Sequence, residues 1–467
     1  MTDQSASQDT GWTALLGGGN LLRALVITGG VGLHAISIYV VVTIMPIVVG
    51  DIGGLPFFAW TATLYVAGSL ASASAVPLLL ARAGPRGAYR LACLLFVAGS
   101  LICSLATSMP FLLVGRLIQG LGGGMLPALG YGLVRAIFPP ALHARAIVLV
   151  GSVWGIAAVA GPAVGGLFAQ YATWRAAFWV DVPIGLAFAL LSGWALPLQA
   201  TATVPRRGFP GLRLALLTAA ALAVSAGGAT AQVLPAAIGA AVAIALIVTM
   251  LRLDRHANGR MLPAGAFDPR TPLGAVSATM GLMIMTAAPC TFIPYILRVG
   301  HGIGPLAGGY VNASYALSWT LVSFLTASAA RGRVREMMIL GPLVMLAGIA
   351  LIAATLPGGN LLWVIAGQCL LGTGIGIGWA HLAALLMAVA APADRDVAGP
   401  FITTTQTLAI IFGSAIAGMT ANLAGIADAT TPAELAHTTA WLFGILAAIP
   451  LAAIFTSWRM LVQTREG

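Results

Sequence analysis

The chain has 467 residues, of which 59% are hydrophobic and only 7% are charged, and its mean hydropathy is +0.98. A soluble domain carries about 25% charged residues, so this composition excludes a water-soluble protein. The formal charge of +10 rests on 22 basic residues, all of them arginines in short clusters between apolar stretches. This distribution is typical of membrane topology signals, not of a nucleic-acid-binding surface.

The chain begins with a polar segment that lacks the features of a secretory signal, so we expect a cytoplasmic tail. Fourteen apolar stretches follow, each of about the 20 residues that cross a bilayer. The first six lie near residues 22–49, 57–80, 89–107, 110–135, 144–170 and 176–198. Two more lie near 211–229 and 233–253, and the last six near 272–297, 305–329, 336–357, 361–391, 397–425 and 438–460.

These stretches predict an all-α polytopic membrane protein with 14 transmembrane helices. We expect a cytoplasmic N-terminal tail at 1–20 and an N-terminal six-helix bundle at 21–199. A cytoplasmic loop with two extra transmembrane helices should occupy 200–260, and a C-terminal six-helix bundle 261–463. Eighteen arginines fall on one side of this arrangement and two on the other. The imbalance predicts a multi-pass protein of the plasma membrane, the bacterial inner membrane, with both termini in the cytoplasm.

An internal repeat relates the two groups of six helices at an offset of 252 residues. Segment 115–124 reads Gly-Arg-xxx-Gly-x-Gly-x-Gly, and segment 367–376 reads Gly-Gln-xxx-Gly-x-Gly-x-Gly. Many secondary transporters are built from two related halves with a site between them. The two central helices stand outside this repeat and are interpreted as a linker pair.

Small residues recur at four-residue spacing in the stretch 144–170, where rows of this kind let a neighbouring helix approach closely. A proline among them removes one backbone hydrogen bond and bends the helix. The plain interpretation is a tight helix crossing. The functional one is a gate that closes one side of a passage, formed by Gly155, Gly161, Pro162, Gly165 and Gly166.

Arg116 lies within the stretch 110–135, with Gln119 and Gly120 one turn further on. A charged residue inside a span costs roughly 2.5–3.5 kcal/mol by insertion scales, so it should face the interior of the bundle or water. Arg116 is therefore either a buried structural residue bonded to carbonyl groups or part of a substrate or proton passage.

Three segments, 115–120, 161–166 and 174–185, read Gly-Arg-xx-Gln-Gly, Gly-Pro-xx-Gly-Gly and Trp-Arg-xx-Phe-Trp-x-Asp-x-Pro-x-Gly. Together they resemble transporters of the major facilitator superfamily, and most closely its fourteen-helix drug:proton antiporters. The resemblance extends over residues 20–460. It implies two six-helix bundles that alternate between inward- and outward-open states, and proton-coupled export of small amphipathic or drug-like molecules.

The chain departs from that family at several positions. The acidic residue usual in the first helix is replaced by Ser37, and Asp181 stands where asparagine is common. With Asp51 and Asp181 both expected near the outer interface, no carboxylate is left at the midplane to pair with a cationic drug. This favours the alternative of a major facilitator transporter for a lipid or a metabolite, such as a sugar or an organic acid, without a drug-efflux role.

Candidate residues for proton coupling or the passage are His34, Ser37, Arg116, Gln119, Asp181 and His381. Histidine titrates near neutral pH, although a histidine within a membrane is also common as a hydrogen-bonded packing residue. Polar or aromatic residues within the stretches could line a substrate cavity or could be packing contacts. They are Tyr65, Asn312, Tyr315, Trp319, Gln368, Thr404 and Gln406.

Several functions are excluded by missing residues. Because the chain has no lysine, it can form neither a P-loop nor a Schiff base. Its four cysteines lie in apolar stretches and form no CxxC pair. We therefore expect no enzymatic activity, no cofactor and no metal site. The expected partners are a small-molecule substrate, protons and the lipid bilayer, with no nucleic acid, and the protein is expected to be a monomer.

Overall fold

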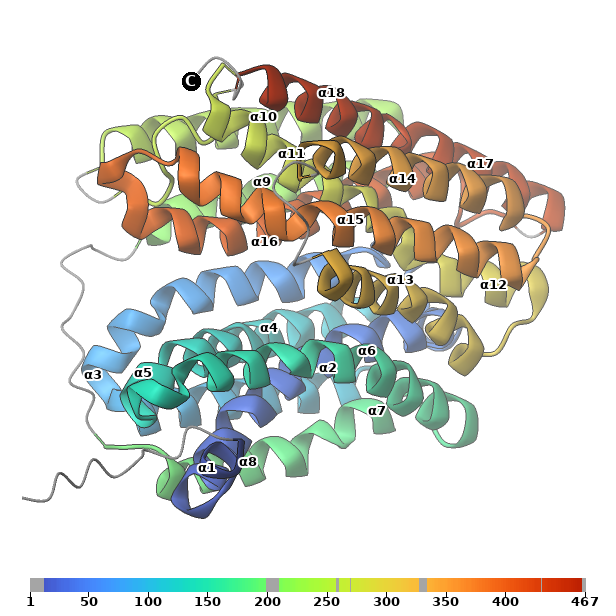
Figure 1. Cartoon of the computed structure of the whole chain (residues 1–467). Helices are drawn as coiled ribbons and strands as arrows, with labels where there is room; N and C mark the ends of the chain where they lie inside the picture. Colours follow the sequence, from blue (N-terminus) through green and yellow to red (C-terminus); the bar gives the residue numbers. More distant parts are fainter. Residues whose placement is uncertain are drawn as a thin grey trace, which may run out of the picture.

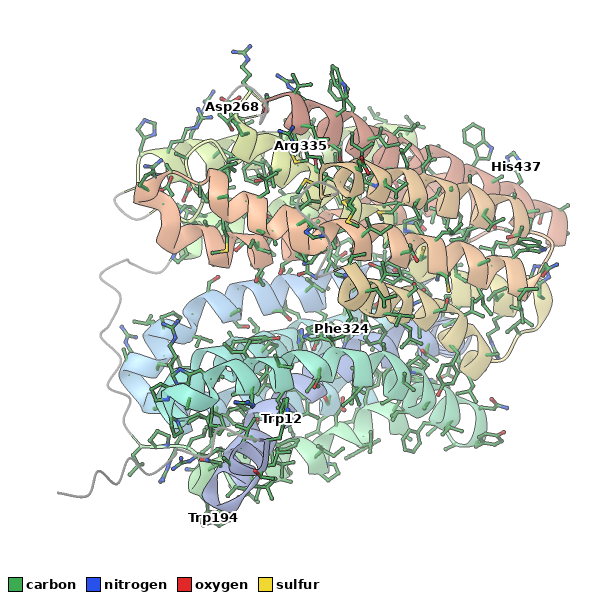
Figure 2. All side chains as sticks on the ribbon, in the orientation of Figure 1. Trp12, Trp194, Asp268, Phe324, Arg335 and His437 are labelled. Carbon is green, nitrogen blue, oxygen red and sulfur yellow. The ribbon has the colours of Figure 1, made fainter. Side chains whose placement is uncertain are left out.

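A computed structural model describes residues 12–198, 210–257, 260–268, 270–326, 334–429 and 431–463, and every regular element in these ranges is a helix. Figure 1 shows two groups of helices, α1–α8 below and α9–α18 above, with α13 at their boundary. Large apolar side chains cover the outside of both groups. Trp194, at the lower edge in Figure 2, is 73% exposed, as expected for a residue that faces lipid.

The lower group contains the long helices of the first half of the chain and their short connecting helices. In chain order these are α1 (Trp12–Leu16), α2 (Gly18–Ile52), η1 (Leu55–Phe57), α3 (Trp60–Ser104), α4 (Met109–Gly132), α5 (Val134–Ile137), η2 (Pro140–Leu142), α6 (His143–Tyr171), α7 (Ala176–Trp179) and α8 (Asp181–Ala195). The first membrane helix thus begins at Gly18, before its predicted start at 22.

The upper group begins with the linker pair, α9 (Gly211–Gly228) and α10 (Val233–Arg255). The remaining helices are α11 (Pro272–Thr286), η3 (Ala288–Phe292), α12 (Ile293–His301), α13 (Pro305–Thr326), α14 (Val334–Thr355), α15 (Leu361–Val389), η5 (Pro392–Asp394), α16 (Arg395–Leu423), α17 (Pro432–Leu446) and α18 (Ala448–Gln463).

Twelve helical segments in the described ranges are long and apolar enough to cross a membrane. One of them, Leu55–Ser104, has 50 residues and contains two of the predicted spans, while α13, with 22 residues, is not among the twelve. The total of 14 is reached if the 50-residue segment crosses twice and α13 crosses once, so the number of spans stays a prediction.

The predicted loop between the second and third spans is helical in the structure. The range given for α3 holds two helical arms that meet at Gly84, whose φ of 66° and ψ of 176° lie outside the helical region. Glycine adopts this conformation without the steric cost of a side chain, and Pro85 then starts the second arm. The sharp reversal between the two spans therefore needs only one non-helical residue.

Glycines of the internal repeat bring helices into close contact in both halves. A Cβ atom at Gly120 of α4 would lie 2.2 Å from the carbonyl oxygen of Tyr65 on α3. A Cβ atom at Gly372 of α15 would lie 2.0 Å from the carbonyl oxygen of Tyr315 on α13. The two halves thus build the same type of crossing, which places a polar side chain at the start of each glycine series inside its bundle.

The linker pair packs on α16 through a small apolar cluster of Ala220, Val224, Ala243 and Ala415. At the other end of the pair, Arg213 of α9 forms an ion pair with Asp254 of α10. Asp254 also accepts hydrogen bonds from the backbone of Met261 (2.8 Å) and Leu262 (3.1 Å). The proposed boundary between the linker segment and the C-terminal bundle, at 260/261, therefore falls in a loop that this carboxylate anchors.

Candidate functional site

Arg116 is completely enclosed in the N-terminal bundle, with 1% of its surface exposed. Its Nε donates to the carbonyl oxygen of Thr61 (3.2 Å), and its Nη1 donates to Ser37 Oγ (3.2 Å) and to Gln119 Oε1. The guanidinium also lies 4.0 Å from the centre of the Tyr65 ring. Hydrogen bonds and a cation–π contact thus replace the water that this charge would otherwise require.

Gln119 connects this cation to a carboxylate. Its Nε2 donates to Ser100 Oγ (2.7 Å) and to Asp181 Oδ2 (3.3 Å), while its Oε1 accepts from Arg116. Ser100 Oγ lies 3.4 Å from the same carboxylate oxygen and donates to it. The amide dipole is therefore aligned between a positive and a negative group, and each of these side chains is at most 8% exposed.

His34 meets the same network from the other side. The hydroxyl of Tyr65 lies 2.9 Å from His34 Nδ1 and 3.2 Å from the carbonyl oxygen of His34. A Cβ atom at Gly123 would lie 2.6 Å from that hydroxyl and 3.0 Å from the imidazole, so only glycine leaves room for the pair. His34 also contacts the Trp154 ring edge-on, with centroids 5.8 Å apart.

Five of the six proton-coupling candidates therefore form one polar network across α2, α3, α4 and α8. Hydrogen bonds link His34 to Tyr65 and Arg116 through Gln119 to Asp181, and a cation–π contact between Arg116 and the Tyr65 ring joins the two parts. Asp181 lies at the start of α8, is buried, and faces the interior of the bundle, whereas its predicted position near the outer interface stays a prediction. We call these residues the N-bundle polar network. Its members are His34, Ser37, Thr61, Tyr65, Ser100, Arg116, Gln119 and Asp181.

The C-terminal half brings fewer of its candidates together. Gln368, fully buried, donates from Nε2 to Asn312 Oδ1 (3.2 Å), and its own Oε1 has no hydrogen-bond partner in the described structure. Tyr315 and Trp319 are neighbours on α13, with ring centroids 6.0 Å apart, and Trp379 of α15 lies 5.9 Å from Trp319.

The remaining candidates of this half are more scattered. His381, on α15, has a buried Nε2 without a hydrogen-bond partner among the described residues. Thr404 and Gln406 lie half-buried on α16. Among the residues that the structure describes, these candidates do not join into a second polar network of the kind seen around Arg116.

The small residues of α6 face two different helices. A Cβ atom at Gly161 would lie 2.3 Å from Tyr39 Cβ, and one at Gly165 would lie 3.0 Å from the carbonyl oxygen of Val40, both on α2. The others face α13 in the other group. A Cβ atom at Gly166 would lie 2.6 Å from Leu306 Cα, one at Gly309 would lie 3.0 Å from Pro162 Cβ, and one at Gly155 would lie 4.0 Å from Thr320 Cγ2. Through these small residues, α6 packs closely on α2 of its own group and on α13 of the other group.

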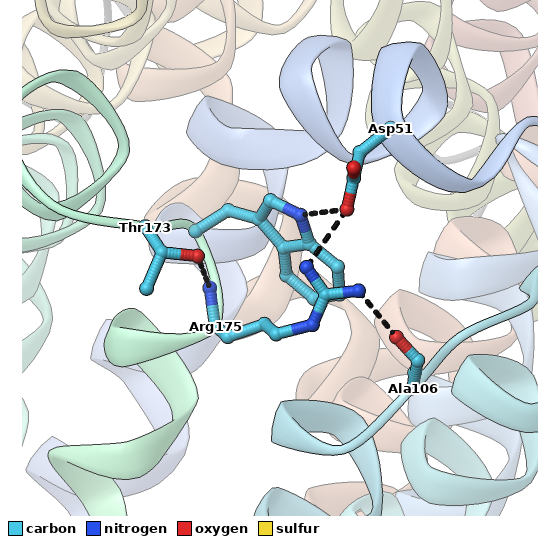
Figure 3. A network of polar contacts seen from close by, with 5 residues as sticks. Asp51, Ala106, Thr173 and Arg175 are labelled. Atoms are coloured by element: carbon cyan, nitrogen blue, oxygen red, sulfur yellow. Dashed lines mark hydrogen bonds and ion pairs between the residues drawn. The ribbon is translucent and has the colours of Figure 1, made fainter.

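Figure 3 shows a second polar cluster, at the end of the molecule that the arginine distribution predicts to face outward, which we call the outer end. Arg175 Nη1 pairs with Asp51 Oδ2 at 2.8 Å, and Arg175 Nη2 donates to the carbonyl oxygen of Ala106 at 2.8 Å. Trp174 Nε1 donates to the same Asp51 oxygen at 3.0 Å. The cluster ties the end of α2 to the α3–α4 and α6–α7 turns.

Ser100 and Thr61 belong to the N-bundle polar network but were not among the sequence candidates. Ser100 follows Gly99, at which a Cβ atom would lie 2.2 Å from the backbone nitrogen of Gln119. This close approach lets the short serine side chain reach Gln119. Thr61 contributes a backbone carbonyl, which no side-chain pattern reveals.

A family model and individual related proteins identify the same family for this chain. The profile described as Major Facilitator Superfamily matches residues 27–267. A "Probable multidrug-efflux transporter" of Mycobacterium tuberculosis is 34% identical over 461 residues, which cover 95% of this chain and 97% of that protein. The "Multidrug transporter protein MdtP" of Bacillus subtilis is 26% identical over 368 residues, or 76% of this chain and 67% of that protein.

Solved structures show the same fold at low sequence identity. The crystal structure of the POT family transporter PepTSo gives a TM-score of 0.66 at 14% identity, covering 95% of this chain and 98% of that one. A D-xylose-proton symporter gives 0.63 at 15% identity, with 93% and 97% covered. The chain thus belongs to the major facilitator superfamily: it is a multi-pass membrane transporter of small molecules, related to proteins named as multidrug-efflux transporters.

Proposed function

We propose that this protein exports small amphipathic, drug-like molecules by alternating access, and that proton entry drives the export. The observation that carries the coupling is the N-bundle polar network, in which a buried arginine connects His34 and Asp181, two groups that can take up or release a proton. The names of the relatives support the substrate class.

Asp181 supplies the negative charge that the first helix lacks. Ser37 occupies the position where related antiporters carry an acid, and its hydroxyl accepts a hydrogen bond from Arg116 (3.2 Å). A carboxylate at Asp181 reaches the same arginine through Gln119. In this arrangement, protonation of Asp181 removes the charge that balances Arg116 and so changes the forces between α4 and α8.

Efflux of a neutral fluorescent amphiphile from proteoliposomes, with and without an imposed pH gradient, tests the proposal. We expect faster efflux with the gradient and expect His34→Ala to abolish this acceleration while substrate exchange continues. Efflux at a rate independent of the pH gradient would contradict proton coupling. Gradient-driven efflux at the unmodified rate in His34→Ala would contradict the role of His34.

Transport of a lipid or metabolite is the second candidate, and the serine at position 37 favours it because no carboxylate on α2 can meet a cation there. Efflux assays with a cationic dye and a neutral amphiphile, together with lipid analysis of a deletion strain, separate the two. We further propose that the protein is a monomer of the bacterial inner membrane, is not an enzyme, and has both termini in the cytoplasm.

A further inference from the structure

Asn422, near the end of α16, joins three parts of the molecule with one amide group. Its Nδ2 donates to the carbonyl oxygen of Pro56 (2.9 Å), in η1 of the N-terminal group, and to the carbonyl oxygen of Gly228 (3.1 Å), the last residue of α9. The side chain is 4% exposed. One buried residue of the C-terminal bundle thus holds both the N-terminal bundle and the linker pair.

The Gly228 carbonyl at the end of α9 fixes the orientation of the Asn422 amide. The last carbonyl groups of a helix have no partner within that helix, so Gly228 offers an acceptor in a fixed direction. The two hydrogens of a primary amide lie in one plane, and a bond from one of them to Gly228 sets the direction of the other. That second hydrogen reaches Pro56.

Neighbouring residues on the same face of α16 repeat this pattern. A Cβ atom at Gly418 would lie 2.6 Å from Ala59 Cβ, next to η1, and a Cβ atom at Gly228 would lie 2.5 Å from Met419 Cβ. One turn earlier, Ala415 belongs to the apolar cluster through which α16 packs on α9. Beside this face, Phe58 of the N-terminal group stacks on Phe292 of η3 with ring centroids 4.9 Å apart.

We infer that the α9–α10 pair is part of the outer gate: by holding Asn422 through Gly228, it aims the hydrogen bond that closes the N-terminal bundle onto α16 at Pro56. Opening of the outer end separates Pro56 from Asn422 and leaves the Gly228 bond intact, because α9 packs more extensively on α16 than on α3 of the N-terminal group. The inference rests on the proposed alternation of the bundles, not on the coupling ion.

The test measures how fast an outer-end position reacts with a membrane-impermeant maleimide in right-side-out vesicles. The reporter is A59C, at a position that is 3% exposed, in a chain carrying C93A, C103A, C290A and C369A. We expect Asn422→Leu to increase the labelling rate about three- to tenfold, because of the two bonds it removes only the one to Pro56 joins the C-terminal bundle to the N-terminal bundle. Asn422→Asp keeps the size but removes both donors and should act in the same direction.

A matched control removes a similar bond that lies inside one bundle. Thr438, 2% exposed, donates from Oγ1 to the carbonyl oxygen of Ala424 (3.0 Å), at the same end of the molecule. Thr438→Val should label at the parental rate. Equal acceleration by this variant would show that the C-terminal bundle has loosened in general, and would overturn the role of the Asn422–Pro56 bond, which we call the latch.

The role of the linker pair has its own variant. In Gly228→Ala the added methyl group meets Met419, shifts α9 away from α16 and disturbs the acceptor of Asn422. We expect faster labelling of A59C, and expect the double variant with Asn422→Leu to label no faster than Asn422→Leu alone, because both act through one bond. A parental rate in Gly228→Ala would overturn the role of the linker pair.

Gly166→Leu provides the reference for an open outer end, because its side chain would push α13 away at Leu306. If it accelerates labelling and Asn422→Leu does not, the latch is wrong and alternation stands. If neither accelerates labelling, the alternation of the bundles fails and the latch fails with it. Thermal unfolding in detergent identifies variants that label because they are unfolded.

Discussion

The two halves of the molecule carry the same glycine series but different polar residues at its start. In the N-terminal half, Arg116 binds Thr61, Ser37 and Gln119 and lies over the Tyr65 ring. In the C-terminal half, Gln368 binds Asn312 and leaves its Oε1 without a partner in the described structure. Both halves thus contain the same type of helix crossing, and in the described residues the charged network lies in the N-terminal half.

The difference separates packing from transport chemistry. Both side chains reach from the fourth helix of their half to a neighbouring helix at a similar register, Arg116 to Thr61 and Gln368 to Asn312. Such a bond satisfies a buried polar group in either half. Among the described residues, a carboxylate and a histidine join the bonded group around Arg116 and not the pair of Gln368 and Asn312, so the comparison predicts that loss of transport follows changes in the N-terminal half.

Arg116→Gln gives the N-terminal half the residue of the C-terminal half and should have the largest effect. Asp181 and Gln119 then lose the only buried cation of their network, and removal of one partner from a buried charged set costs roughly 3 kcal/mol or more. We expect gradient-driven efflux to fall by more than about tenfold and the melting temperature to drop. Arg175→Gln, which removes a partly exposed pair with Asp51, serves as the control and should cost about 1 kcal/mol or less. Normal driven efflux in Arg116→Gln would contradict the role of the network.

Asp181→Asn removes the negative charge but keeps a side chain of the same shape. We expect driven efflux to fall to the rate measured without a pH gradient, while exchange of substrate continues, because the Arg116 bonds to α2 and α3 remain. Proteoliposome efflux at several pH gradients measures this. Asp51→Asn changes a carboxylate of the same bundle that lies at the outer end and should keep its gradient dependence. A gradient response in Asp181→Asn would assign the proton to another group.

Tyr65→Phe keeps the ring over Arg116 and removes only the hydroxyl that meets His34. Loss of one buried hydrogen bond weakens the connection by about 0.5–1.5 kcal/mol, so driven efflux should fall about two- to tenfold. The effect should be smaller than that of His34→Ala, measured in the same assay. A stronger effect in Tyr65→Phe than in His34→Ala would show that the hydroxyl acts without the histidine.

Gln368→Leu should have the smallest effect. It removes a buried oxygen that lacks a partner together with one hydrogen bond, and these two changes oppose each other. We expect a stability change within about 1 kcal/mol and driven efflux within about twofold of the unmodified protein. A loss comparable to that of Arg116→Gln would mean that both halves carry coupling chemistry.

Much of the fold is readable in the sequence because hydropathy and glycine spacing are local properties of a helix. The membrane class, the two groups of helices and the burial of Arg116 follow from them. The sequence also placed His34, Ser37, Gln119 and Asp181 among the candidates. It did not reveal that the loop between the second and third spans shrinks to one non-helical residue, Gly84, since a single residue leaves almost no local pattern.

The sequence by itself determined that this chain crosses a membrane repeatedly and that one arginine must be sheltered inside it, because the cost of exposing charge to lipid depends on residue type alone. Only the tertiary structure decided that Asp181 faces Gln119 and Ser100, and that Asn422 reaches Pro56 and Gly228. Those contacts join residues 62, 366 and 194 positions apart in the chain. They depend on how each helix is rotated and where it crosses its neighbours, and no short segment of sequence contains that information.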